Sequence, residues 1–219
     1  AAILAARLPA LIAGFQWPKS QRWGKASIST ASPRWVRPLR GIVALLDDQI
    51  VPFEALGLDS GRTTFGHRFL SDGAPIHIAD AGSYAAQLAD AHVILSAEER
   101  RAKIAESAAA AAAKAGVKLR PDAGLEQENA GLTEWPVPLA GHFDEAYLAV
   151  PPEIIQLTMR TNQKYFACED AAGGLAPWFV CVANLEAPDG GRTIVAGNER
   201  VLSARLADGS PIRIVALGS

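Results

Sequence analysis

Residues 163–184, QKYFACEDAAGGLAPWFVCVAN, hold two apolar segments on either side of the polar, glycine-rich stretch Asp170-Ala171-Ala172-Gly173-Gly174. Two apolar segments joined by turn-forming residues predict a β-hairpin, with strands over 163–169 and 178–184. The β-branched and aromatic residues in both segments favour strands as well. This is the strongest hairpin signal in the chain.

The rest of the chain mixes helices and strands without a regular strand–helix–strand alternation. The clearest helix covers residues 97–115, because Ser96 and Glu99 form a capping box and Gly116 is a stop signal. Further helices are predicted at 2–13, 80–91, 123–131, 151–160 and 193–207, and strands at 41–46, 49–56, 63–65, 76–78, 92–95 and 135–140. Pro136 and Pro138 place the last of these strands at a sheet edge. The pattern predicts an α+β fold with a mixed, largely antiparallel sheet and flanking helices.

Charge is unevenly distributed along the chain. Residues 1–40 contain seven Lys and Arg residues and no Asp or Glu, whereas residues 41–219 contain 14 basic and 23 acidic residues. Trp17, Trp23 and Trp35, three of the five tryptophans, lie in the same basic stretch. Basic groups neutralise phosphates and aromatic rings stack on unpaired bases, so this stretch is a candidate RNA-binding segment. The alternative is a solvated face with the tryptophans packed beneath it.

Several kinds of site are absent from the sequence. It has no phosphate-binding G-x-x-x-x-G-K-[ST] loop, no G-x-G-x-x-G fingerprint and no G-x-S-x-G nucleophile elbow. The four histidines lack zinc-site spacing, and Cys168 and Cys181 fit reduced thiols in a cytosolic protein. No stretch reaches the roughly 20 apolar residues that span a bilayer, and residues 1–13 do not resemble a signal peptide. We therefore expect no catalytic residue, metal or cofactor within this region.

Cations near the predicted strands are the best candidates for binding phosphate. They are Lys19, Arg22, Arg37, Arg40, Arg68 and Lys164, with His67 beside Arg68. Arg pairs with phosphate or carboxylate through two parallel hydrogen bonds, which suits this role. The alternative for Arg37, Arg40, Arg68 and Lys164 is internal ion pairing with residues such as Glu54, Glu134 or Glu199. The sequence leaves these two interpretations open.

Short motifs in a fixed order resemble the beta subunits of bacterial two-subunit glycyl-tRNA synthetases. Residues 18–24, PKSQRWG, resemble a PKSMRWG stretch of that family, with Gln21 in place of methionine. The order continues with RPLR at 37–40, GHRF at 66–69, EER at 98–100, EWP at 134–136, LAVP at 148–151, QKYF at 163–166, VAN at 182–184, GNERVL at 197–202 and RLAD at 205–208. The resemblance covers residues 3–208, after which Gly209–Ser219 departs from the family pattern.

The resemblance implies a part of a longer subunit that acts in charging tRNA with glycine. It implies glycine tRNA and an alpha subunit as partners, ATP and Mg used by the complete enzyme, the active site on the alpha subunit, and a cytoplasmic location. It also implies a fold similar to the editing-type module of the phenylalanyl-tRNA synthetase beta subunit. We expect a basic helix and connecting segment at 1–40, an α+β core domain at 41–208, and a non-native or disordered tail at 209–219.

Three functions remain open on this basis. The region could bind tRNA or act as a scaffold, which the basic residues 1–40 favour. It could be an editing-type hydrolase for mischarged tRNA, which would require His67, Arg68 and a carboxylate to share a pocket. It could also be a structural domain that docks the alpha subunit or other beta-subunit domains, which would leave a broad apolar surface exposed.

Overall fold

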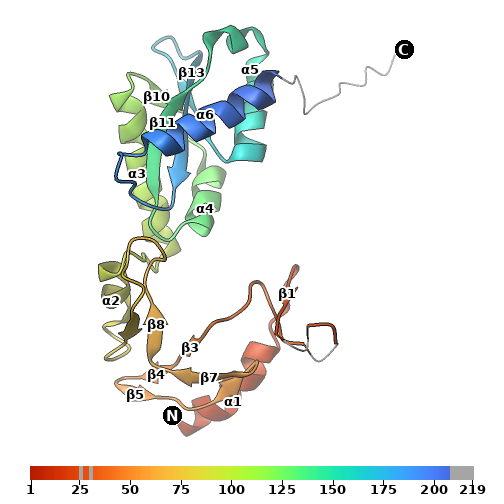
Figure 1. Cartoon of the computed structure of the whole chain (residues 1–219), viewed down its shortest axis with the longest axis vertical. Helices are drawn as coiled ribbons and strands as arrows, with labels where there is room; N and C mark the ends of the chain where they lie inside the picture. The colour runs from red at the N-terminus through yellow and green to blue at the C-terminus, as the bar shows by residue number, and fades with distance from the viewer. Residues whose placement is uncertain (25–26, 30–31, 208–219) are drawn as a thin grey trace. The chain divides into compact units, whose positions relative to one another are not determined.

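The computed structural model describes residues 1–24, 27–29 and 32–207, and the chain forms two compact units that divide between Val93 and Ile94 (Figure 1). This boundary differs from the one expected at residue 40. Helix α1 (Ala2–Ala13) packs against strand β6 (Glu54–Ala55), so the basic segment folds with residues 41–93. The boundary between the units falls within the region expected as one domain at 41–208, and the expected tail at 209–219 lies outside the described residues.

The first unit combines α1 with short strands and one more helix. These are β1 (Gln21–Arg22), β2 (Arg34–Trp35), β3 (Ile42–Val43), β4 (Leu45–Leu46), β5 (Gln49–Ile50), β6, β7 (Leu58–Gly61), β8 (Thr63–Phe65), β9 (Pro75–His77) and α2 (Tyr84–Asp90). The pairs β1–β2, β4–β5, β6–β7 and β8–β9 are antiparallel, and β3 runs parallel to β7. Val51, Ile78 and Leu88 are buried at the centre of this unit.

The strand predicted at 92–95 is wrong, because these residues end helix α2. The N–H of Val93 donates to the carbonyl of Leu88 at 2.9 Å, and that of His92 donates to Ala89 at 3.0 Å. His92 adopts a left-handed φ of 60° in this turn, a position that usually holds glycine at the end of a helix. Val93 and Ile94, the β-branched residues that suggested a strand, therefore follow the C-terminal cap of α2.

The second unit is built on an antiparallel sheet in the order β10-β12-β13-β11. Its elements are α3 (Ala97–Lys114), β10 (Lys118–Leu119), α4 (Ala123–Leu132), β11 (Val137–His142), a 3-10 turn (Glu145–Ala149), α5 (Pro152–Thr158), a π turn (Met159–Gln163), β12 (Phe166–Glu169), β13 (Leu175–Ala183) and α6 (Arg192–Ala207). The predicted hairpin is confirmed as the central pair β12–β13. Asp170 Oδ1 accepts the N–H groups of Ala172 and Gly174 at 2.8 and 2.9 Å, and Gly173 has the positive φ that the turn requires.

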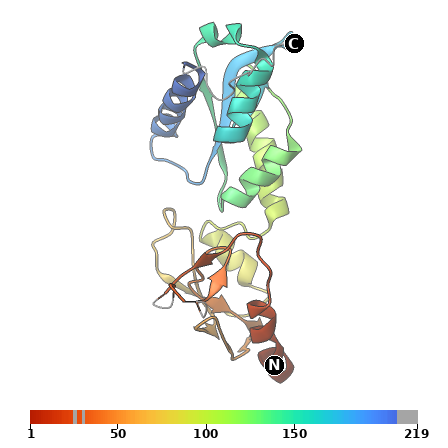
Figure 2. The same ribbon diagram turned by 90° about the vertical axis from the view of Figure 1, so that its right-hand side faces the viewer.

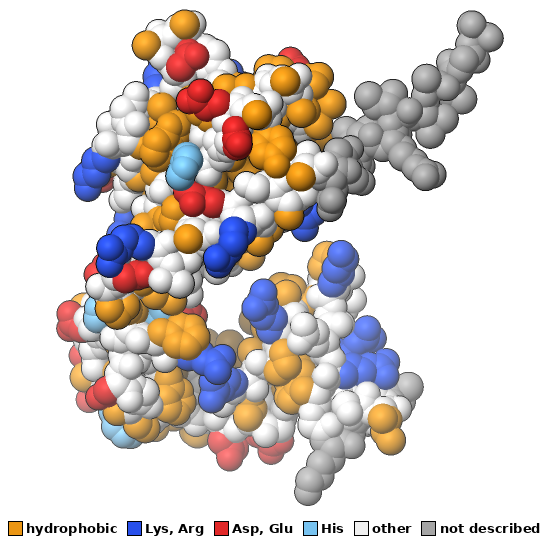
Figure 3. Space-filling model, turned by 45° about the horizontal axis from the view of Figure 1, so that its top comes forward, with side chains coloured by type: hydrophobic (Ala, Val, Ile, Leu, Met, Phe, Trp, Pro, Cys, Tyr) orange, Lys and Arg blue, Asp and Glu red, His pale blue; other side chains and the backbone are white. Residues whose placement is uncertain are grey.

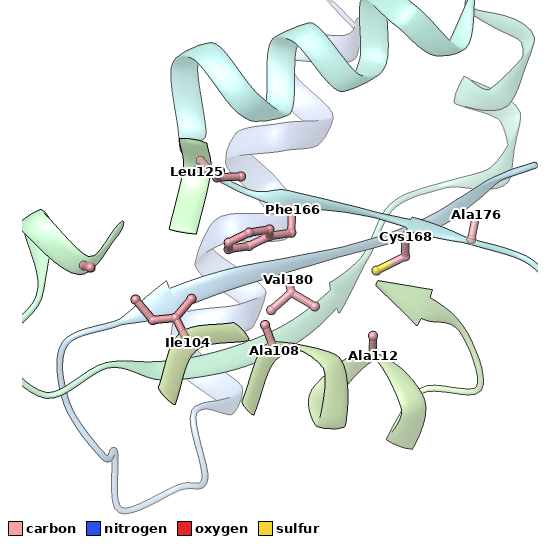
Figure 4. Close-up of a cluster of buried hydrophobic side chains, with 9 residues drawn as sticks. Ile104, Ala108, Ala112, Leu125, Phe166, Cys168, Ala176 and Val180 are labelled. Atoms are coloured by element: carbon pink, nitrogen blue, oxygen red, sulfur yellow. The ribbon is translucent and has the colours of Figure 1, made fainter. Parts of the chain in front are cut away.

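Helices cover both faces of this sheet, with α3 and α6 on opposite sides (Figure 2). Val180 belongs to a core cluster with α3 and α4, whereas Phe179 and Cys181 belong to a cluster with α5 and α6. The first cluster contains Ile104, Ala108, Ala112, Leu125, Phe166, Cys168, Ala176 and Val180 (Figure 4). Successive strand residues point to opposite faces, so burial on both sides explains why the β13 sequence is apolar without interruption.

The predicted fold class is confirmed. The helices expected at 2–13, 97–115, 123–131, 151–160 and 193–207 all form, and Ser96 Oγ accepts the N–H of Glu99 at 3.2 Å as the capping box predicts. Strand β11 lies at the sheet edge, as its prolines indicated. No helix among the described residues is long and apolar enough to cross a membrane.

Candidate nucleic-acid-binding surface

Two arginines face each other across the β1–β2 ribbon of the first unit. Arg22 lies directly opposite Arg34, and both side chains are exposed. Like charges in this position repel each other and destabilise a strand pair. A bound anion would remove that repulsion, and guanidinium groups suit phosphate. Arg34 was not among the predicted site residues, although the polar segment Arg34–Arg40 was a signal for it.

An aromatic cluster follows helix α1 and includes one residue of the same ribbon. The rings of Phe15 and Trp17 stack with centroids 5.5 Å apart, and Trp35 meets them edge-on at 5.4 and 4.9 Å. Trp17 and Trp35 are half-buried, as the packed-tryptophan interpretation expects, whereas Phe15 is 51% exposed. The cluster thus stiffens the basic segment and leaves one ring open to solvent.

The candidate cations of residues 1–40 form no ion pair with a carboxylate among the described residues. Lys19, Arg22, Arg37 and Arg40 are exposed, and no acidic residue precedes Asp47. Among residues 1–24, 27–29 and 32–207, every ion pair joins two residues of the second unit. Of the residues for which internal ion pairing was the alternative, Arg37, Arg40 and Arg68 thus form no ion pair within the described part of the chain. Figure 3 shows how Lys and Arg side chains are distributed on one face of the molecule.

The Gly66-His67-Arg68-Phe69 segment is a tightly packed turn. His67 is fully buried, and its Nδ1 accepts the N–H groups of Phe69 and Leu70, both at 3.2 Å. A Cβ on Gly66 would lie 2.6 Å from the Cβ of Ala91, so the turn has no room for a larger residue. His67 is thus enclosed in the turn, whereas Arg68 beside it is exposed.

Lys164 has a structural explanation. Its φ is 60°, its carbonyl accepts a hydrogen bond from Asn129, and its Nζ lies 2.7 Å from Glu128 Oε1. The ion-pair alternative is thus confirmed for Lys164, with Glu128 of α4 as the partner. Lys164 also belongs to the second unit, apart from the other candidates.

The two thiols of the second unit are poor nucleophiles. Both are buried, and burial raises the pKa of Cys168 to about 12 and that of Cys181 to about 11. A thiolate is the reactive form of cysteine, so neither group is activated at neutral pH. Within the described residues, His, Cys, Asp and Glu side chains form no group of three that could hold a metal ion.

The segment 197–202 attaches helix α6 to the sheet. Asn198 Oδ1 accepts the hydroxyl of Tyr165 at 2.7 Å, and its Nδ2 donates to Cys181 Sγ at 3.5 Å. Glu199 Oε1 accepts the backbone N–H of His142 at 3.0 Å and lies 2.7 Å from the same residue's Nδ1. These polar residues therefore hold α6 against β11, β13 and Tyr165, the residue before β12.

Replacing Asn198 with alanine is expected to lower the free energy of unfolding by about 1–3 kcal/mol, because the buried Tyr165 hydroxyl loses its acceptor. Tyr165→Phe removes the donor instead and should cost less, about 1 kcal/mol. The check is urea denaturation of both variants and of the double variant. If Asn198→Ala costs the same with and without the Tyr165→Phe substitution, the hydrogen bond between the two side chains does not contribute to stability.

Three other motifs also have structural roles. Asn184 Oδ1 accepts the N–H groups of Glu134 and Trp135 at 2.7 and 2.9 Å, which ties the end of β13 to the start of β11. Arg100 donates to the carbonyls of Ile94, Leu95 and Ala130. The EER, EWP, VAN and GNERVL motifs thus contribute to the packing of the second unit.

A groove of about 1050 Å³ runs along the β11 edge between α3 and α6. Its lining includes small residues of α3 (Ser107, Ala110, Ala111) and the two prolines at 136 and 138. Those prolines have no N–H to offer, and Glu199 already accepts the N–H of His142. These features disfavour the pairing of a further strand along this edge.

Comparison with known proteins identifies the family of the chain. The family model described as "Glycyl-tRNA synthetase beta subunit" matches residues 1–210. Proteins named glycine–tRNA ligase beta subunit from Phenylobacterium zucineum and Paracoccus denitrificans are 49% and 48% identical over 94% and 95% of the chain. One from Rhodospirillum centenum is 46% identical over 92% of it. The chain spans about 30% of the length of these relatives, 30% in the first two and 31% in the third. With a family match across nearly its whole length, the chain belongs to the glycyl-tRNA synthetase beta subunit family.

Proposed function

We propose that this region contributes tRNA binding to glycine–tRNA ligase. The observation that supports it is the set of exposed, unneutralised cations in the first unit, with Arg22 directly opposite Arg34. In this proposal glycine tRNA and the alpha subunit are the partners, and the alpha subunit carries the active site. ATP and Mg are used there, in the cytoplasm, and the first unit helps to hold the tRNA.

The two other functions have less support. The hydrolase hypothesis required His67 to share a pocket with Arg68 and a carboxylate, and His67 is buried in a turn. The relation to the editing-type module of phenylalanyl-tRNA synthetase stays a prediction. The docking hypothesis required a broad apolar surface, and the lining of the groove beside β11 mixes apolar residues with both signs of charge.

The double substitution Arg22→Gln and Arg34→Gln tests the proposal in the complete two-subunit enzyme. We expect the KM for glycine tRNA to rise roughly tenfold or more, because two phosphate-binding groups are removed. The kcat should change less than about twofold, because the chemical step does not involve these residues. Lys118→Gln with Arg200→Gln, two exposed cations of the second unit, is the matched control. A fall in kcat at unchanged KM, or an equal effect of the control, would count against tRNA binding by the ribbon.

A further inference from the structure

Exposed aromatic rings are confined to the first unit. Phe15, Phe65 and Phe69 are 51%, 50% and 67% exposed, and every other Phe, Tyr and Trp side chain among the described residues is buried or half-buried. All three lie before residue 94. A single exposed apolar side chain is ordinary, but rings confined to the unit with the unneutralised cations require an explanation.

Two of these rings lie against the guanidinium group of an arginine. The guanidinium carbon of Arg68 lies 5.4 Å from the centre of the Phe69 ring, and that of Arg40 lies 6.0 Å from the Phe65 ring. Neither arginine forms an ion pair among the described residues. Phe15 instead stacks on Trp17. Each ring thus contacts a neighbouring arginine or tryptophan and keeps about half or more of its surface exposed.

We propose that the first unit binds unpaired RNA nucleotides, whose bases stack on Phe15, Phe65 and Phe69 while the neighbouring arginines hold the phosphates. Aromatic rings and guanidinium planes are the surfaces on which proteins stack unpaired bases. In a duplex the base faces are covered by neighbouring pairs, so an exposed phenyl ring gains little from a double helix. The inference rests on the proposed tRNA binding and specifies which kind of nucleotide is bound.

The test compares two RNA probes of equal length, an unstructured oligouridine and a perfectly paired hairpin stem. Phe65→Leu with Phe69→Leu keeps two exposed apolar side chains and removes two rings. We expect affinity for oligouridine to fall about tenfold or more, and affinity for the stem to change less than about twofold. Because neither substitution removes a cation, the salt dependence of binding should stay the same.

Leu132→Ala with Leu157→Ala is the control, since both residues are exposed and lie in the second unit. Phe15→Leu is measured separately, because that ring also packs on two tryptophans.

Equal losses on both probes, or no loss on oligouridine, would overturn the stacking inference. If the unsubstituted chain binds the stem and glycine tRNA but not oligouridine, stacking fails and the proposed function stands. If it binds no RNA, both fail. If the double variant binds RNA normally but no longer co-purifies with the alpha subunit, the rings contact protein and the inference is wrong.

Discussion

Replacing Phe179 with alanine is expected to lower the free energy of unfolding of the second unit by about 3–5 kcal/mol. Phe179 is fully buried on the central strand β13, and its ring stacks on Tyr165 with centroids 4.7 Å apart. On the neighbouring strand, a Cβ at Gly141 would lie 2.6 Å from Phe179 Cζ, so the ring already fills the space that glycine leaves. Truncation would remove this packing and leave a cavity between the sheet and α6.

The measurement is urea denaturation followed by far-ultraviolet circular dichroism, which reports mainly on the second unit because α3, α4, α5 and α6 belong to it. Phe69→Ala is the control, since that ring is 67% exposed and its removal should change the free energy by no more than about 0.5 kcal/mol. A decrease below about 1 kcal/mol for Phe179→Ala would show that the described packing is wrong.

The largest effect on binding is expected from removing four cations of the first unit together. Lys19, Arg22, Arg34 and Arg37 replaced by Gln should weaken tRNA binding on the order of a hundred- to a thousandfold at low salt, because each phosphate contact adds an independent electrostatic contribution. All four side chains are exposed, so the fold should be kept. The measurement is a binding titration with labelled glycine tRNA.

The control for this prediction removes the same charge from the second unit. Lys114, Lys118, Arg192 and Arg200 are also exposed, and their replacement by Gln should leave the affinity within a few-fold of the original. Equal decreases in the two variants would show that binding depends on net charge alone and not on the surface of the first unit. A second tRNA should bind with an affinity similar to that of glycine tRNA, because contacts to phosphates do not depend on the base sequence.

The elements that are predicted correctly are determined by residues close to them in the sequence. The β12–β13 hairpin is determined by Asp170 and Gly173 within its own turn, and the α3 start by Ser96 and Glu99. The strand expected at 92–95 failed because His92 takes a left-handed conformation, and because Ile94 donates to the distant carbonyl of Glu134. No periodicity in the sequence reveals such interactions.

The positive charge of the candidate site was predictable from the sequence, but the burial of individual side chains was not. The acid-free basic stretch identified Lys19, Arg22, Arg37 and Arg40 as exposed cations, and the structure confirms that exposure. His67 was selected because it lies beside Arg68, yet its Nδ1 is used by the turn that buries it. Burial of this kind depends on how residues 66 and 91 pack, which is a tertiary interaction.

The salt dependence of glycine tRNA binding tests the central claim most directly. We predict that log Kobs falls steeply with log salt, and that replacing Lys19, Arg22, Arg34 and Arg37 reduces the magnitude of that slope by roughly 3, because each neutralised phosphate adds about 0.7 in a single strand and about 0.9 in a duplex. The variant with four substitutions in the second unit should keep the original slope. Identical slopes for the original chain and the variant of the first unit would contradict the claim that this surface binds the tRNA backbone.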